Sequence, residues 1–343
     1  MNRCLLLVDH LNPLSPTGEV GSFAEKLRLQ GDTVRVIESS RLFQRRRLCT
    51  LSLRRLHDQI KTFRPDKIYC WGSQSLQVGA WLKRIPVAWT GALGWWACRA
   101  TQWNAIHTSA TRLLSEPAGI TGALHYSCFD RHHFRTEPAR HAVQQQFPKW
   151  RTLVLPWTRR QASDDGIDFQ LRRRLSIPDD ATVIGTAAEL VPRSRIKDFI
   201  WAGDLMSCIR DDVYWLVIGQ GQQKTRLQRF AGHLEIGDNL RFLDWHENSD
   251  RIVAQLNMYV QMSTYDDSCI GMRHALANGV PVIATSAQPH RCLVNHGVNG
   301  FVVEQGAGNE IARCANRLIN QPEIAASFSV AAKRTLEAMP QAA

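Results

Sequence analysis

Residues 256–285 contain the clearest structural pattern in the chain and read LNMYVQMSTYDDSCIGMRHALANGVPVIAT. Its first part, residues 256–262, is a short apolar run with the length and residue types of a β-strand. After Gly271 the apolar positions recur at helical spacing, until Asn278 and Gly279 predict the end of the helix. The run that follows predicts a second strand, so the stretch predicts one βαβ unit of a parallel sheet.

The loop and the helix start inside this unit are the expected ligand site. In a parallel sheet, ligands bind where a strand ends and the next helix begins. Here that place holds Ser268, Ile270, Gly271 and Met272. The backbone N–H groups of a first helical turn have no partner within the helix, and they suit a phosphate group. An ordinary crossover without a ligand is the alternative interpretation of this unit taken alone.

The same stretch resembles the donor-site segment of the family-4 retaining glycosyltransferases, the glycosyl transferases group 1, which have the GT-B fold. The resemblance rests on ALANGVPVIAT at residues 275–285, which matches the family's pattern nearly throughout. The family has two glutamates separated by seven residues, and these positions hold Asp266 and His274 in this chain. The resemblance implies that Asp266 is the catalytic-site carboxylate that contacts hydroxyl groups of the transferred sugar. It implies that His274 takes the ribose-binding place, and the altered pair leaves the activity open.

The length and composition indicate a two-domain globular protein. A chain of 343 residues is long for one hydrophobic core, and its fractions of 44% hydrophobic and 21% charged residues are those of soluble domains. No apolar run approaches the roughly 20 residues of a membrane span. The apolar run at residues 4–8 ends at Asp9, so it predicts a first strand and not a signal peptide. Nine cysteines without a Cys-x-x-Cys pair favour a reduced, cytoplasmic protein.

The positive charge belongs entirely to the first half of the chain. Residues 1–158 hold 22 Lys and Arg against 10 Asp and Glu, whereas residues 159–343 hold 20 against 21. A one-sided basic surface favours an anionic partner, either an acidic glycan or the inner face of a membrane, to which the protein would attach peripherally. A general solubility bias is the alternative. No nucleic acid is expected, because no binding module frames the arginines.

Strand-like runs alternate with helical segments along both halves, which predicts parallel sheets covered on both faces. We expect an acceptor-side Rossmann-like domain at residues 1–158 and a nucleotide-sugar-binding Rossmann-like domain at 159–320. The helical segment at 321–343 is expected to pack back on the first domain. By resemblance to GT-B proteins, the two doubly wound domains face each other across a cleft.

The loop before the first predicted helix holds Gly18 and Gly21. Glycine permits a close approach of the backbone to a ligand. The resemblance implies that this loop approaches the donor phosphates, and an ordinary loop is the alternative.

The second half follows the order of family motifs over about residues 170–320. Glu189-Leu-Val-Pro stands where the family has Arg-Leu-Val-Pro, and Ser194 stands where the family has a lysine. The family uses that arginine and lysine to hold the donor phosphates. We expect neighbouring cations to replace them from a shifted register, with a solvated basic turn as the alternative. These cations are Arg193, Arg195 and Lys197. Gly219 belongs to a Gly-x-Gly after a predicted strand, which also matches a family element.

The resemblance implies transfer of a hexose from a nucleotide-diphosphate sugar to a glycan or lipid-linked acceptor, with retention and without a metal or cofactor. The physical requirement is stabilisation of the leaving diphosphate, which fixed amides and cations supply. Two alternatives remain at this point: a catalytically inactive GT-B scaffold that acts as a binding or assembly partner, and a sugar-nucleotide epimerase.

Overall fold

The computed structural model describes residues 2–8, 20–38, 43–44, 47–48, 50–84, 102–106, 129–134, 137–154, 169–244, 249–263 and 269–337. Over these residues the chain divides into two compact units, residues 2–154 and residues 169–337. Each unit is an α/β layer structure and is described by itself. The predicted domain boundary between residues 158 and 159 lies outside the described residues.

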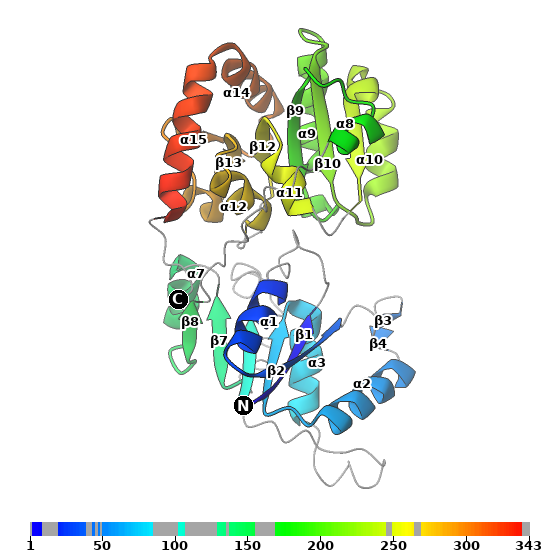
Figure 1. Ribbon diagram of the computed structural model, residues 1–343, viewed down its shortest axis with the longest axis vertical. Helices are drawn as coiled ribbons and strands as arrows, with labels where there is room; N and C mark the ends of the chain where they lie inside the picture. The colour runs from blue at the N-terminus through cyan, green and yellow to red at the C-terminus, as the bar shows by residue number, and fades with distance from the viewer. Residues whose placement is uncertain are drawn as a thin grey trace. The chain divides into compact units, whose positions relative to one another are not determined.

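The first unit is built on a six-stranded sheet with the order β2-β1-β5-β6-β7-β8, in which all neighbours are parallel (Figure 1). A separate two-stranded antiparallel ribbon, β3-β4, accompanies it. Its described elements are β1 (Arg3–Val8), α1 (Val20–Leu29), β2 (Thr33–Glu38), β3 (Phe43–Gln44), β4 (Arg47–Leu48), α2 (Thr50–Phe63), β5 (Lys67–Trp71), α3 (Ser73–Arg84), β6 (Gln102–Ile106), β7 (Arg131–Phe134), α7 (Glu137–Gln146) and β8 (Thr152–Val154).

The sequence of β1 explains why both faces of this sheet are covered. Residues 4–8 are all apolar and fully buried. Successive side chains of a strand point to opposite faces. Leu5 and Leu7 accordingly join a core cluster with α2 and α3, and Leu6 and Val8 join a cluster with α1. A strand that is buried on both faces belongs in the middle of a doubly wound sheet.

Strand β7 was not predicted from the sequence, because Arg-His-His-Phe does not read as a buried strand. His132 is enclosed by aromatic packing from elsewhere in the unit, and His133 Nε2 lies 3.4 Å from Asn104 Oδ1 of β6. The His132 ring stacks on Trp150 with centroids 3.9 Å apart, and Trp150 stacks in turn on Phe147. Burial lowers the pKa of His132 to about 3 and that of His133 to about 4, so both rings stay neutral near pH 7.

We expect these two histidines to make the fold sensitive to acid. Their pKa values are lower in the folded chain than in the unfolded one, so the unfolded chain binds more protons below about pH 6.5. Going from pH 7 to pH 5 should lower the free energy of unfolding by about 2 kcal/mol per histidine. His132→Phe keeps a ring against Trp150 and should lose less stability over this range. Thermal melting at both pH values tests this, with His141→Gln on the exposed face of α7 as the control. Identical pH dependence in all three proteins would contradict it.

The second unit has a six-stranded parallel sheet with the order β11-β10-β9-β12-β13-β14 (Figure 1). This is the 3-2-1-4-5-6 order of the dinucleotide-binding fold. Its described elements are α8 (Phe169–Arg174), β9 (Thr182–Ala187), η2 (Pro192–Ser194), α9 (Ile196–Ser207), β10 (Val213–Ile218), α10 (Lys224–Ala231), η3 (Glu235–Asn239), β11 (Leu240–Leu243), α11 (Ser249–Ala254), β12 (Met258–Gln261), α12 (Ile270–Ala277), β13 (Val282–Thr285), α13 (Gln288–Arg291), β14 (Gly300–Val303), α14 (Gly308–Asn320) and α15 (Pro322–Glu337).

Helices cover this sheet on both faces. Helix α9 packs beside α14 and touches α10, whereas α12 packs between α11 and α15. The first group closes a core in which Phe199 of α9 meets the Trp215 ring of β10 edge to face, with centroids 4.8 Å apart. The prediction of two doubly wound α/β domains is therefore confirmed by the two parallel sheets.

The predicted βαβ unit is present as β12, α12 and β13, and its helix ends where the sequence predicts. Asn278 is the C-cap residue of α12, and Gly279 follows with a φ of +73°. The N–H of Val280 donates to Ala275 O at 2.8 Å, and the N–H of Gly279 donates to Leu276 O at 3.1 Å. This is a Schellman motif, in which glycine takes the left-handed position.

Helix α15 packs within the second unit over its described length. The Phe328 ring lies edge-on to Phe301 of β14, with centroids 5.0 Å apart, and Ser329 Oγ donates to the carbonyl of Gly279. The idea that residues 321–343 also return to the first domain stays a prediction.

Candidate functional site

The strand order of the second unit fixes where a ligand site belongs. From β9 the chain moves outward to β10 and β11, and it then returns to place β12 on the other side of β9. In open α/β sheets, ligands bind at the carboxyl ends of the two strands beside such a reversal. Here these are the ends of β9 and β12. The turn at residues 188–195 follows β9, and the start of α12 follows β12.

The turn after β9 is held in place by the loop after β10. Leu190 N donates to Gln220 O at 2.9 Å, and Leu190 O accepts from Gln223 N at 3.0 Å. A Cβ on Gly219 would lie 2.0 Å from Ala188 O. The Gly-x-Gly element therefore permits two backbones to touch, and Gly219 supports the turn after β9 through that contact.

The first predicted cation in this turn is engaged by a carboxylate. Arg193 Nη2 lies 2.8 Å from Glu189 Oε2, with both side chains about half exposed at 49% and 48%. The Ser194 hydroxyl is buried and donates to Glu189 O at 2.6 Å. Glu189 and Ser194, which stand at the family's arginine and lysine positions, thus bond within the turn itself, and Glu189 also holds the Arg193 guanidinium.

The other two predicted cations begin helix α9. Arg195 has a left-handed backbone with a φ of 53°, and its Nε donates to Asp198 Oδ2 at 2.6 Å. Its guanidinium also lies against Gly306, where a Cβ would come within 2.9 Å of Nη2. Lys197 points toward α10, with its ammonium 4.6 Å from the centroid of the Phe230 ring. The structure brings Arg193 and Arg195 together in one turn and directs Lys197 to a neighbouring helix.

Helix α12 begins with an unusual cap. Cys269 precedes it with a φ of 47°, and no side chain caps the first turn. The amide of Arg273 donates to Cys269 O at 2.8 Å, so it begins the pattern of helical hydrogen bonds. The three earlier amides, those of Ile270, Gly271 and Met272, have no acceptor within the helix by its geometry. The predicted amide set therefore occupies the first turn of a helix at the strand reversal.

His274 lies one turn further along α12 than Ile270, and it is only 6% exposed. Its carbonyl accepts from the side-chain amide of Asn278 at 2.8 Å. The structure therefore places His274 in a buried position one turn beyond the predicted amide set.

Three predicted site residues lie outside the described part of the chain: Gly18, Asp266 and Ser268. Gly21 is described, in the first turn of α1, which follows the carboxyl end of β1. It is exposed, and no heavy atom lies within 4 Å of the place of a Cβ. The fold therefore does not require glycine at residue 21, which leaves a ligand contact as a role for it.

The sequence analysis missed a buried polar chain next to this site. Tyr259 Oη lies 2.9 Å from Gln261 Oε1 and 3.2 Å from Ala187 O, and Gln261 Nε2 donates to Ser263 Oγ at 2.6 Å. All three side chains are buried. The available signal was Gln261 itself, a polar residue inside the apolar run YVQM.

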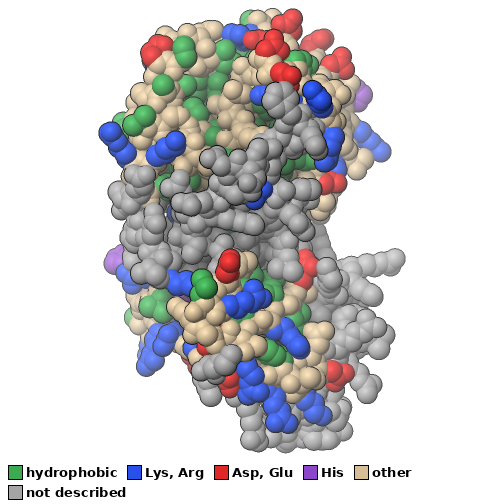
Figure 2. Space-filling model, in the orientation of Figure 1, with side chains coloured by type: hydrophobic (Ala, Val, Ile, Leu, Met, Phe, Trp, Pro, Cys, Tyr) green, Lys and Arg blue, Asp and Glu red, His purple; other side chains and the backbone are tan. Residues whose placement is uncertain are grey.

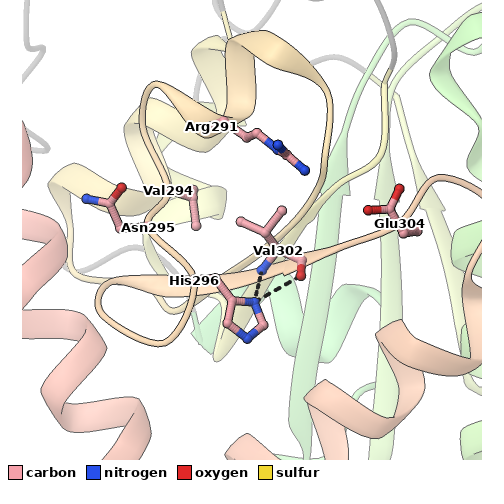
Figure 3. Close-up of a pocket in the computed structure, with 6 residues that line it drawn as sticks. All are labelled: Arg291, Val294, Asn295, His296, Val302 and Glu304. Carbon is pink, nitrogen blue, oxygen red and sulfur yellow. Dashed lines mark hydrogen bonds between the residues drawn. The ribbon is translucent and has the colours of Figure 1, made fainter.

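A hollow of about 400 Å³ on the second unit is lined by other residues (Figure 3). Its lining residues are Arg291, Val294, Asn295, His296, Val302 and Glu304. It adjoins β14, two strands away from β12 in the sheet. Nδ1 of His296 accepts from the Val302 backbone at 3.1 Å, and Glu304 accepts from Ser286 Oγ at 2.9 Å. No predicted site residue lines this hollow.

Among the described residues, no three His, Cys, Asp or Glu side chains come together as a metal site. None of the described helices is long and apolar enough to cross a membrane.

Comparison with known proteins identifies the second unit. Residues 168–335 match the family model of glycosyl transferases group 1. The lipopolysaccharide core biosynthesis glycosyltransferase LpsE of Rhizobium meliloti is 24% identical over 43% of this chain and 42% of its own length. A GDP-mannose-dependent phosphatidylinositol monomannoside mannosyltransferase of Corynebacterium glutamicum is 27% identical over 49% of this chain and 45% of its own. The chain thus spans less than half the length of these curated relatives.

Solved structures resemble the whole chain. HepE of Anabaena, in complex with UDP and glucose, superimposes with a TM-score of 0.71 at 17% identity, over 98% of this chain and 95% of HepE. WaaG, a glycosyltransferase involved in lipopolysaccharide biosynthesis, superimposes with a TM-score of 0.70 at 10% identity, over 98% and 95%. At these identities the likeness shows the fold. The family match shows that the second unit belongs to the glycosyl transferases group 1, and the two parallel sheets together with these superpositions show that the chain has the GT-B fold.

Proposed function

We propose that the chain is a retaining hexosyltransferase that takes its sugar from a nucleotide-diphosphate donor and passes it to a glycan or lipid-linked acceptor. The observation that carries this proposal is the placement of two anion-binding elements at one strand reversal. These are the turn with Arg193 and Arg195, and the first turn of α12. HepE, which shares the fold, was solved with UDP and glucose, which supports a nucleotide-sugar donor.

The proposed chemistry depends on stabilising the diphosphate as the bond to the sugar breaks. Amides that are fixed before the reaction stabilise developing negative charge without reorganisation, and they act best where water is excluded. Ile270, Gly271 and Met272 are buried, so their amides meet both conditions. Arg193 and Arg195 add positive charge, which lets the reaction proceed without a metal ion.

The remaining residues take roles by resemblance. Asp266 contacts hydroxyl groups of the transferred sugar, and Ser268 lies next to the phosphates in the same segment. His274 forms one hydrogen bond with the ribose, where the family's glutamate accepts two. Gly18 and Gly21 give the backbone of their loop access to the donor.

A donor panel tests the reaction and its stereochemistry. The full chain is incubated with UDP-, GDP- and ADP-sugars, with and without a chelator, and proton NMR follows the released sugar. We expect nucleotide diphosphate and the retained anomer from one nucleotide class, with no effect of the chelator. An inverted first-formed anomer would contradict retention, and loss of activity with the chelator would contradict the metal-independent mechanism.

One observation favours the inactive scaffold as a second candidate. Glu189 places a carboxylate in the turn where the family has an arginine, and it already engages Arg193. A diphosphate arriving at this turn has to compete with that carboxylate and is repelled by its charge.

Glu189→Gln separates the two candidates. Removing this negative charge and releasing Arg193 should tighten UDP or GDP binding roughly three- to tenfold in a transferase. Calorimetry of wild type and variant measures the change. Glu323→Gln, an exposed glutamate of α15, controls for the general loss of charge. Unchanged affinity in Glu189→Gln would show that the turn does not face the phosphates.

We also propose that the protein works in the cytoplasm, with its first unit attached peripherally to anionic membrane or bound to an acidic glycan. The charge excess of the first half supports this, and Figure 2 shows Lys and Arg side chains spread over the visible surface of that unit. Co-sedimentation should show binding to anionic liposomes at low salt that weakens at high salt. Equal binding to neutral liposomes would contradict an electrostatic attachment.

A further inference from the structure

Three separate segments of the second unit meet at one oxygen atom, the hydroxyl of Tyr259. The end of β9 reaches it through Ala187 O, at 3.2 Å, and the end of β12 through Gln261 Oε1, at 2.9 Å. The first turn of α12 rests directly on it, because a Cβ on Gly271 would lie 2.3 Å from this hydroxyl. Gln261 extends the contact to Ser263, where the chain leaves the sheet.

The side chains of Tyr259, Gln261 and Ser263 are hydrogen-bonded to one another away from solvent. Tyr259 is fully buried, and Gln261 and Ser263 are only 2% and 6% exposed. A buried amide or hydroxyl is costly unless it is hydrogen-bonded, and here each of the three side chains has a partner. Apolar side chains at all three positions would fill a similar volume without polar groups, and replacing the partners of a hydrogen bond together by apolar groups of the same shape is often close to neutral for stability.

Compared with apolar packing, a row of hydrogen bonds fixes the distances and angles between the groups that it joins. Apolar side chains in a core accept small shifts of their neighbours, whereas hydrogen bonds weaken when their distance or angle changes. The hydroxyl of Tyr259 therefore sets how close the first turn of α12 comes to the end of β9. That distance relates the amides of α12 to the turn that holds Arg193 and Arg195.

We infer that Tyr259 and Gln261 are positioning residues that fix the first turn of α12, and with it the diphosphate-binding amides, against the end of β9. The inference rests on the proposed function for its consequence in donor binding. Neither residue contacts the donor in this account. Both act through Gly271 and Ser263.

The test compares Tyr259→Phe/Gln261→Leu with wild type in the full chain. Hydrogen exchange followed by mass spectrometry reports on the peptide at residues 269–277, where the amide of Arg273 is bonded to Cys269 O. We expect exchange there to become about tenfold faster, while the peptide of α14 keeps its rate. Calorimetry should show UDP or GDP binding weakened about tenfold. Tyr214→Phe on β10 is the matched control, because it removes a tyrosine hydroxyl that lies outside the hydrogen-bonded set of Tyr259, Gln261 and Ser263.

Each outcome decides a different claim. Unchanged exchange at residues 269–277 would overturn the positioning role, whatever the nucleotide affinity. If exchange at residues 269–277 is faster in the variant but the wild-type chain binds neither UDP nor GDP, the positioning role is supported and the proposed function is contradicted. If exchange in α14 rises as well, the single variant Tyr259→Phe carries the same test, because it keeps the ring and removes only the hydroxyl.

Discussion

Gly219→Ala should destabilise the second unit by about 3 kcal/mol and abolish tight donor binding. The new Cβ would lie 2.0 Å from Ala188 O, which is a backbone atom and cannot rotate away. Relief requires the loop after β10 to separate from the turn after β9. That turn carries Arg193 and Arg195, so the displacement reaches the proposed phosphate site.

Urea unfolding of the variant measures the loss, with Gly232→Ala as the control. A Cβ on Gly232 would find its nearest atom, Gln228 O, at 3.6 Å, which is an ordinary contact. The control should therefore change the free energy of unfolding by no more than about 0.5 kcal/mol. Equal effects of the two substitutions would show that the contact between the loops is not what Gly219 provides.

Asp266→Asn should lower turnover about tenfold or more, which corresponds to roughly 1.4 kcal/mol or above in the activation free energy. The substitution keeps the size of the side chain and removes the charge that is proposed to act on the sugar hydroxyls. Asp267→Asn changes the neighbouring carboxylate and should keep most of the activity. Steady-state release of nucleotide diphosphate compares the three proteins, and equal loss in both variants would remove the special role of Asp266.

His274→Glu restores the family's residue and should tighten nucleotide binding if the pocket keeps the family's geometry. The position is buried, so a carboxylate there is costly without a hydrogen-bonding ligand. In an inactive scaffold the variant should therefore lose stability and gain no affinity. Thermal shift with and without UDP or GDP distinguishes these results.

The sequence predicted the fold well where local signals agree with tertiary structure. The βαβ unit was recognisable because its apolar runs, its helical spacing and the pair Asn278-Gly279 all indicate the same elements, and the Schellman motif confirms the helix end. Strand β7 was missed for the opposite reason. His132 is buried by stacking on Trp150, a contact across 18 residues that no local pattern announces.

The candidate site was predictable as a set of segments but not as a set of contacts. Arg193, Arg195 and Lys197 are close in sequence, and the first two accordingly share one turn, whereas Lys197 lies at the start of α9. Their partners did not follow, because the ring over which Lys197 lies is 33 residues away, at Phe230. The contact of Gly219 with Ala188 O did not follow either, since it depends on the pairing of β9 with β10, and a contact of Gly219 with the donor stays a prediction.

The polar chain at Tyr259 shows what a periodicity analysis leaves out. Apolar runs are scored by their average character, and the single amide of Gln261 does not change the assignment of a strand. Its significance emerges only when β12 lies beside β9 and α12 folds back over both.

Calorimetric titration of the wild-type chain with UDP-, GDP- and ADP-sugars measures whether the strand reversal of the second unit holds a nucleotide-diphosphate donor. We expect saturable binding to one nucleotide class, weakened in Gly219→Ala and tightened in Glu189→Gln. Absence of binding to every donor in the panel, by a chain that unfolds cooperatively, would contradict the transferase assignment and leave the GT-B scaffold as the better account.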